Sequence, residues 1–143
     1  MNTQNDYLLA FKGSFTSALR WHQLDELWRV LNEDAAGGWY IYAVGESPPL
    51  QPVDAEGLSR FVSGIDELLR REHDEKYCGI VYADDLKRPA FIKIYDPNNL
   101  GVSCGYSDNP PLPGWVLSKI PPVDLAALKS PNNRKRWWRA LWG

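Results

Sequence analysis

The sequence predicts a single α+β domain built on a mainly antiparallel sheet of about five strands. Three observations lead to this prediction. The length of 143 residues suits one domain. Two segments carry apolar residues at helical spacing, and four strand-like segments follow one another with connections short enough for antiparallel hairpins. The predicted order is helix, strand, helix and then a four-strand meander, with the helices on one face and a short C-terminal helix.

The first predicted helix covers residues 15–33. Apolar side chains recur there at spacings of three and four, and Ser14 or Ser17 is a candidate N-cap. Ahead of this helix, residues 7–11 form an apolar run too short for periodicity to distinguish an edge strand from a helix. We interpret that run as extended structure.

The first predicted strand, residues 39–44, is rich in aromatic and β-branched residues and ends at a turn that contains glycine and proline. A second helix is predicted after Asp54, which stands where an N-cap belongs. Its apolar stripe would bury one helical face against the sheet. The stripe consists of Leu58, Phe61, Val62, Ile65, Leu68 and Leu69.

Four strands are then predicted over residues 77–83, 90–95, 101–106 and 115–120. In the second of them, two isoleucines alternate with aromatic and charged side chains, so one face belongs to the core and the other is amphipathic. The alternating residues are Phe91, Ile92, Lys93, Ile94 and Tyr95.

Residues 130–143 are predicted to form a basic and aromatic segment that is distinct from the domain of residues 1–129. Ser130 and Pro131 suit an N-cap and the first position of a helix that ends near Trp142. The last ten residues carry four of the 16 basic residues and none of the 18 acidic ones, which leaves residues 1–133 with 12 basic and 18 acidic residues and a net charge of −6. An acidic domain repels polyanions, so nucleic acid is a disfavoured partner.

The C-terminal segment suggests the leading functional prediction, a non-catalytic small cytosolic protein that interacts with or regulates a partner protein. On a helix its tryptophans share one side, and Lys135, Arg136 and Arg139 share the other, with Arg134 as the exception. Tryptophan and arginine are enriched in binding hot spots. Docking on its own acidic domain and self-association remain open, and peripheral membrane contact is disfavoured because the segment is short. The predicted contact residues are Arg136, Trp137, Trp138, Arg139, Leu141 and Trp142.

The alternative prediction is a small enzyme or ligand-binding domain with a pocket between helix and sheet. Aromatic residues of the strands, with one cysteine, are the candidates for its lining or for an exposed aromatic face. These residues are Tyr40, Tyr42, Phe91, Tyr95 and Cys104.

No catalytic residue, metal ligand or cofactor is predicted. The spacing of His22, His73, Cys78 and Cys104 matches no zinc motif, and the two cysteines are expected to be buried thiols. The loop aspartates are interpreted as turn residues. These aspartates are Asp84, Asp85, Asp96 and Asp108.

The location expected from the sequence is cytoplasmic. The first residues lack the basic and apolar regions of a secretory signal, and no apolar run reaches the roughly 18 residues of a membrane span. Two proline-rich loops, residues 47–52 and 109–113, each contain the P-x-x-P spacing of SH3 ligands. We interpret both as rigid connections.

Overall fold

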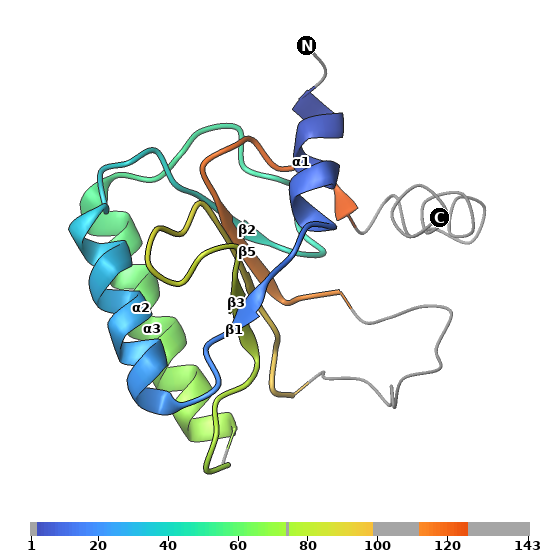
Figure 1. Ribbon diagram of the computed structural model, residues 1–143. Coiled ribbons are helices and arrows are strands. Elements are labelled where there is room, and N and C mark those ends of the chain that lie inside the picture. The colour runs from blue at the N-terminus through green and yellow to red at the C-terminus, as the bar shows by residue number, and fades with distance from the viewer. Residues whose placement is uncertain (1–2, 74, 99–111, 126–143) are drawn as a thin grey trace, which may run out of the picture.

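The computed structural model describes residues 3–73, 75–98 and 112–125 (Figure 1). Within these residues the chain forms three helices and one five-stranded antiparallel sheet with the strand order β1-β3-β4-β5-β2, which confirms the predicted α+β class. The elements are α1 (Thr3–Phe11), β1 (Thr16–Ser17), α2 (Trp21–Glu33), β2 (Tyr40–Ala43), α3 (Ala55–Glu72), β3 (Val81–Ala83), β4 (Phe91–Ile94) and β5 (Trp115–Ser118).

The centre of the sheet is a three-strand meander in which β3, β4 and β5 pair in succession. Strand β4 pairs directly with β5, whereas the prediction placed a strand over residues 101–106 between them. Strand β2 pairs with β5 and β1 pairs with β3, so these two strands form the edges. The strand predicted over residues 101–106 lies outside the described residues. Strand β1 was not expected from the sequence, because two residues are too few to show a strand period.

Helix α3 forms where the sequence predicts it. Asp54 is its N-cap, with an extended backbone and a side chain that accepts a hydrogen bond from the Gly57 amide at 2.7 Å. This bond satisfies one of the amides that the first turn leaves without a partner. The stripe buries Leu58, Val62, Ile65 and Leu69 completely or nearly so.

Helix α2 begins at Trp21, so the prediction of a helix over residues 15–33 was wrong at its start. Residues 16–17 pair with β3 instead, and the Ala18 amide donates to the carbonyl of Val81 at 2.8 Å. Neither Ser14 nor Ser17 is the cap, because the helix starts after Arg20, whose amide donates to Gln23 Oε1 at 2.9 Å. Pairing with a distant strand therefore overrides the local helical pattern.

Residues 7–11 belong to helix α1, so their interpretation as extended structure was also wrong. Tyr7 and Phe11, which are four residues apart, are both buried, whereas Leu9 between them is 60% exposed. The spacing is that of one helical face packed on a core.

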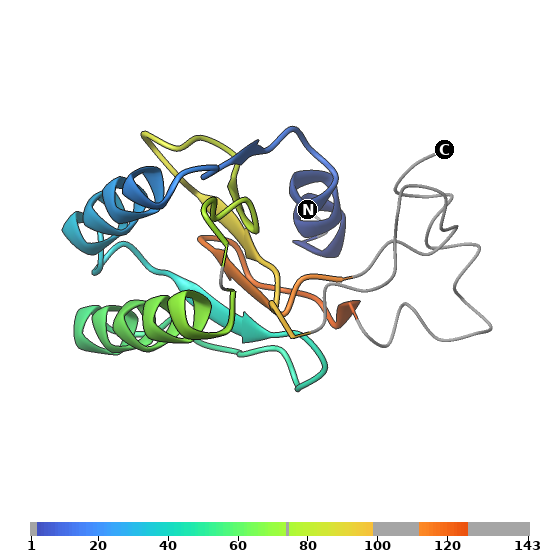
Figure 2. The ribbon, with the colours of Figure 1, turned by 90° about the horizontal axis from the view of Figure 1, so that it is seen from below.

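The helices lie on both faces of the sheet, and the prediction that they share one face holds only for α2 and α3. Figure 2 shows three layers, with α2 and α3 on one side of the strands and α1 on the other. The reason is that β4 and β5 carry large apolar residues on both faces, among them Phe91 and Val116 opposite to Ile92 and Leu117, and both faces must be covered.

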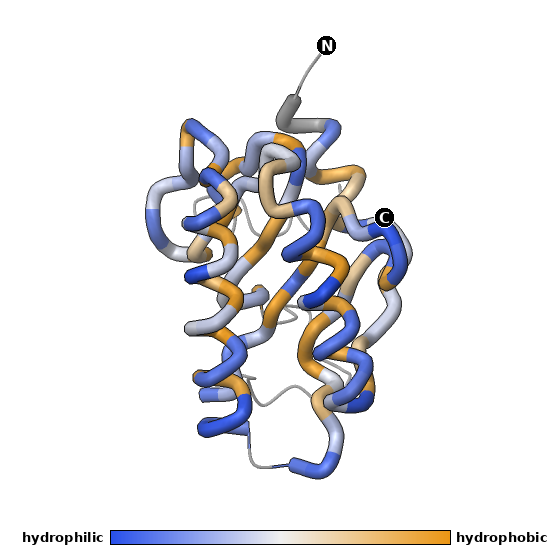
Figure 3. Tube along the Cα trace, turned by 90° about the vertical axis from the view of Figure 1, so that its left-hand side faces the viewer, coloured by the Kyte–Doolittle hydropathy of each residue, from blue (hydrophilic) through white to orange (hydrophobic). Residues whose placement is uncertain are grey.

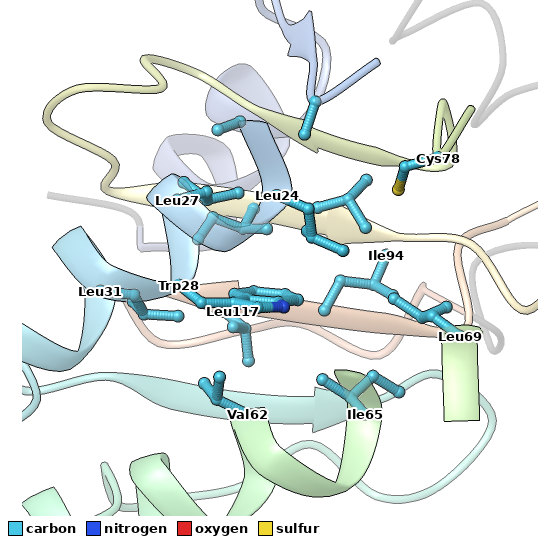
Figure 4. Packing of buried hydrophobic residues seen from close by; sticks show 14 of the residues in the cluster. Leu24, Leu27, Trp28, Leu31, Val62, Ile65, Leu69, Cys78, Ile94 and Leu117 are labelled. Carbon is cyan, nitrogen blue, oxygen red and sulfur yellow. The ribbon is translucent and has the colours of Figure 1, made fainter. Parts of the chain in front are cut away.

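The larger core lies between the sheet and the pair α2 and α3, whose apolar side chains point toward the strands in Figure 4. Along both helices hydrophobic and hydrophilic residues recur in short bands (Figure 3), as expected for amphipathic helices. Trp28 Nε1 donates to Asp66 Oδ1 at 3.0 Å and links α2 to α3. Arg70 of α3 adds an ion pair with Asp25 of α2 at 2.5 Å.

A smaller core occupies the opposite face, where α1 covers β2, β4 and β5. Its centre is the ring of Phe91, whose centroid lies 5.0 Å from that of Tyr7 and 5.8 Å from that of Phe15. The buried members are Tyr7, Phe11, Tyr42, Phe91, Val116, Val123 and Leu125. This aromatic core lies beside the one buried lysine of the described residues, Lys93.

None of the three described helices is both long and apolar enough to cross a membrane.

Candidate lysine pocket

A pocket of about 400 Å³ opens on the α1 side of the sheet, over β3 and β4. One wall is the connection between α1 and β1, and another is the segment that leads into β3. A volume of this size suits a small organic molecule. The lining residues are Gly13, Phe15, Gly79, Ile80, Tyr82, Lys93 and Tyr95.

The strand register places Lys93 in the middle of this face. Lys93 lies on the central strand β4, opposite Tyr82 of β3 and Val116 of β5. Its neighbours Ile92 and Ile94 face the larger core, so the alternation of the strand sends the lysine to the α1 side. The sequence predicted this alternation, but it did not show that α1 and its connection would cover the lysine.

Lys93 is only 9% exposed, and aromatic rings surround its ammonium group. The Nζ atom lies 4.1 Å from the centre of the Phe11 ring and 4.0 Å from that of the Phe15 ring. Both distances are within the range of cation–π attraction, which is stronger where water is excluded. Two rings therefore stabilise the cation from α1 and from the loop after it.

The electrostatic environment still disfavours the charge. Burial lowers the pKa of Lys93 from 10.5 to about 8, because the apolar surroundings solvate the ammonium form less well than water does. Within the described residues no carboxylate pairs with Lys93, whereas Lys119, which is at the surface, pairs with Asp34 at 2.5 Å. The pocket thus holds a buried cation whose counter-charge is not supplied by the described part of the chain.

Two tyrosines add polar groups to the wall beside Lys93. The rings of Tyr82 and Tyr95 meet edge to face, with centroids 5.8 Å apart and an interplanar angle of 82°. Burial, with a smaller contribution from Tyr82, raises the pKa of Tyr95, so this hydroxyl stays protonated at neutral pH. A protonated phenol can donate a hydrogen bond to a ligand.

Gly79 gives the pocket wall its shape. Its φ angle of 70° lies in the left-handed region, which favours glycine because a side chain there is strained. The turn at Gly79 lets the Cys78 amide donate to Leu19 O at 2.7 Å and the Gly79 amide donate to Ala18 O at 3.2 Å. These bonds extend the pairing of β1 with β3 along the edge of the pocket.

Of the residues predicted to line a pocket or form an aromatic face, Tyr95 lines this pocket. Tyr42 and Phe91 are buried beneath α1, and the Tyr42 hydroxyl accepts a hydrogen bond from the Leu125 amide at 3.0 Å. Tyr40 is partly buried on β2, and Cys104 lies outside the described residues. The predicted pocket was placed between helix and sheet. The observed pocket lies instead between the sheet and the loop after α1, on the sheet face opposite to α2 and α3.

Sequence reasoning did not single out Lys93, Tyr82 or Phe15 as site residues. The one available signal was the position of Lys93 between two isoleucines in a strand. A lysine is almost never fully buried in a sheet unless another group compensates for its charge. Phe15 lies 78 residues before Lys93 in the chain, and Tyr82 lies 11 residues before it, so no local motif joins the three.

His73 and Cys78 have structural roles. Cys78 is a buried free thiol, and burial raises its pKa. His73 caps the end of α3, and its Nε2 lies 2.9 Å from the Cys78 carbonyl oxygen. No group of three or more His, Cys, Asp or Glu side chains within the described residues is arranged to hold a metal ion.

The described loop aspartates act as turn residues, as predicted. Asp84 Oδ1 accepts from the amides of Ala90 and Phe91 at 3.0 and 3.1 Å and so closes the β3–β4 hairpin. Asp85 and Asp96 accept from amides two residues ahead, an arrangement typical of such turns. Asp108 lies outside the described residues, as do the predicted contact residues of the C-terminal segment.

The comparisons with known proteins add no relative. No protein-family model matches the chain, and neither a curated protein nor a solved structure is significantly similar to it.

Proposed function

We propose that this protein is a binding domain for a small organic anion, which the pocket holds beside Lys93. The observation that carries the proposal is the buried ammonium group of Lys93, which lines a pocket and forms no ion pair within the described residues. This develops the ligand-binding alternative that the sequence suggested.

The argument begins with the free energy of the buried charge. Taking an ammonium group out of water costs several kcal/mol unless another group compensates for the lost hydration. The rings of Phe11 and Phe15 compensate in part, at about 0.5–2 kcal/mol for each contact. An anionic group in the pocket would supply the remaining compensation and would gain a strong, charge-assisted hydrogen bond.

The other walls of the pocket favour a ligand with a planar apolar body. Phe15, Ile80 and the two tyrosine rings offer apolar and aromatic surface, and stacked or edge-on ring contacts contribute about 0.5–1.5 kcal/mol each beyond area burial. A few polar groups in a mainly apolar cavity are the usual composition of a small-molecule site.

The test is a pair of probes that differ in charge. Naphthalene-1-sulfonate and the neutral naphthalene-1-sulfonamide have nearly the same shape, and isothermal titration calorimetry at neutral pH gives the Kd of each. We expect the sulfonate to bind at least about tenfold more tightly, which corresponds to 1.4 kcal/mol. Equal affinity of the two probes, or no binding of either, would overturn the proposal.

Three variants make the test specific. Lys93→Met should remove the preference for the sulfonate, while Lys93→Arg, which keeps a cation, should retain most of it. Lys87→Met removes an exposed lysine from the β3–β4 loop and should change neither affinity. If Lys93→Met still binds the sulfonate more tightly than the sulfonamide, a group other than Lys93 recognises the negative charge.

Binding of a partner protein through residues 136–142 remains a prediction from the sequence. It is compatible with a ligand pocket in the same chain, and the deletion described in the Discussion tests it separately.

A further inference from the structure

We infer that Lys93 is a site of reversible imine formation with small aldehydes that enter the pocket. The inference rests on the proposed pocket function, but it adds covalent chemistry that the binding of an anion does not require.

The position of the amine is the first part of the argument. Lys93 lines the pocket, and its Nζ lies between two phenylalanine rings instead of beside a carboxylate of the described residues. The other four lysines of the described residues are exposed at the surface. Of the described lysines, Lys93 alone therefore presents its amine to a ligand in surroundings that are largely shielded from water.

The second part is the reactivity of that amine. Only the neutral amine is a nucleophile, and desolvation of a lysine in an apolar pocket is an established way to increase the neutral fraction. Burial alone lowers the pKa of Lys93 to about 8, so roughly a tenth of the molecules carry the free amine at pH 7. An unperturbed lysine, with a pKa of about 10.4, would have less than about a thousandth.

The proposed step is balanced without any further reactant. The lone pair of the neutral Nζ attacks the aldehyde carbon, the C=O π bond breaks, and one of the two amine protons passes to the carbonyl oxygen to give a carbinolamine. The C–O bond then breaks, the hydroxyl group takes up the remaining proton of the nitrogen, and one water molecule leaves as the C=N bond forms. Among the described residues that line the pocket, the titratable side chains besides Lys93 are Tyr82 and Tyr95, and the protonated Tyr95 hydroxyl can donate a hydrogen bond to the carbonyl oxygen during the attack.

Reductive trapping of the full chain tests the inference. Benzaldehyde and sodium cyanoborohydride at pH 7 convert an imine into a stable benzylamine, and peptide mass spectrometry gives the labelling rate of each lysine. We expect Lys93 to be labelled at least about tenfold faster than the exposed Lys87, in spite of its burial. Excess naphthalene-1-sulfonate should slow labelling at Lys93 and leave Lys87 unchanged.

Two further results separate this inference from the proposed function. The labelling rate at Lys93 should level off above about pH 8, where the amine is already neutral. Lys93→Arg, whose guanidinium forms no imine under these conditions, should lose all labelling at this position. Labelling of Lys93 at or below the rate of Lys87 would overturn the inference even if the sulfonate binds, and fast labelling without sulfonate binding would overturn only the proposed function.

Discussion

The ammonium group of Lys93 lies 4.0 Å from the centre of the Phe15 ring, and this contact joins the central strand of the sheet to the loop that follows α1. Phe15 also contacts Phe91 and lines the pocket, so one ring takes part in the aromatic core and in the candidate site. The stability of this face of the sheet and the chemistry of the pocket therefore depend on the same few side chains.

The coupling between Lys93 and Phe15 should be measurable. In a double-mutant cycle of Phe15→Leu and Lys93→Met, we expect a coupling free energy of about 0.5–2 kcal/mol, because only the intact pair makes the cation–π contact. Urea denaturation of the four proteins gives the value. Phe61→Leu, which lies on α3 at the opposite face, should show no coupling with Lys93→Met. If the changes in the free energy of unfolding of Phe15→Leu and Lys93→Met simply add, the cation–π contact is refuted.

The free energy of unfolding should rise with pH because of Lys93. Its folded pKa of about 8 lies below its ordinary value of 10.5, so between these values the unfolded chain binds more protons and alkaline pH favours the folded state. The full effect is roughly 3 kcal/mol at 1.36 kcal/mol per pH unit. Urea denaturation between about pH 7.5 and pH 9.5 covers about half of the change before unfolded tyrosines, with a pKa of about 10, titrate. The raised pKa of the buried Cys78 thiol acts in the opposite direction over the same range, so the contribution of Lys93 is the difference from the Lys93→Met variant.

Lys93→Met is the control for this pH dependence. The variant should lose the rise and should be the more stable protein at pH 7, because an apolar side chain replaces a buried charge without a carboxylate partner in the described structure. A pH dependence identical to that of the unmodified protein would show that Lys93 keeps its ordinary pKa.

The N-cap of α3 should contribute about 1 kcal/mol to stability. Asp54→Ala removes the acceptor of the Gly57 amide and leaves that amide without its 2.7 Å bond. Thermal or urea denaturation measures the loss. The matched variant is Glu56→Ala in the same helical turn, whose ion pair with Arg60 is largely exposed and should contribute less than about 0.5 kcal/mol. Equal losses would argue against the cap.

Deletion of residues 131–143 tests the prediction made for the C-terminal segment. If the segment contacts a partner protein, the melting temperature should stay nearly unchanged, and proteins that the full chain captures from a native lysate should be lost. Docking on the domain predicts instead a loss of several kcal/mol, because buried tryptophans would become exposed or be removed. If neither stability nor capture changes, both forms of the prediction are wrong.

The sequence by itself determined the elements whose signals are local. Helix α3 combines an N-cap aspartate with a long apolar stripe, and turn residues separate β3 from β4, so the helix and the antiparallel pairing of these two strands could be predicted. The alternation in β4 also assigned Lys93 and Tyr95 to the face away from the isoleucines. These features depend on periods and caps that a few neighbouring residues express.

Only the tertiary structure decided how the second face of the sheet is covered. Residues 7–11 are too few to reveal a period, and Thr16–Ser17 becomes a strand only because β3 offers an edge to pair with. Packing of α1 on that face removes water from Lys93 and places two aromatic rings beside it. Desolvation depends on segments that are distant in the chain, and it turns a lysine that the sequence marks only as amphipathic into the centre of the candidate site.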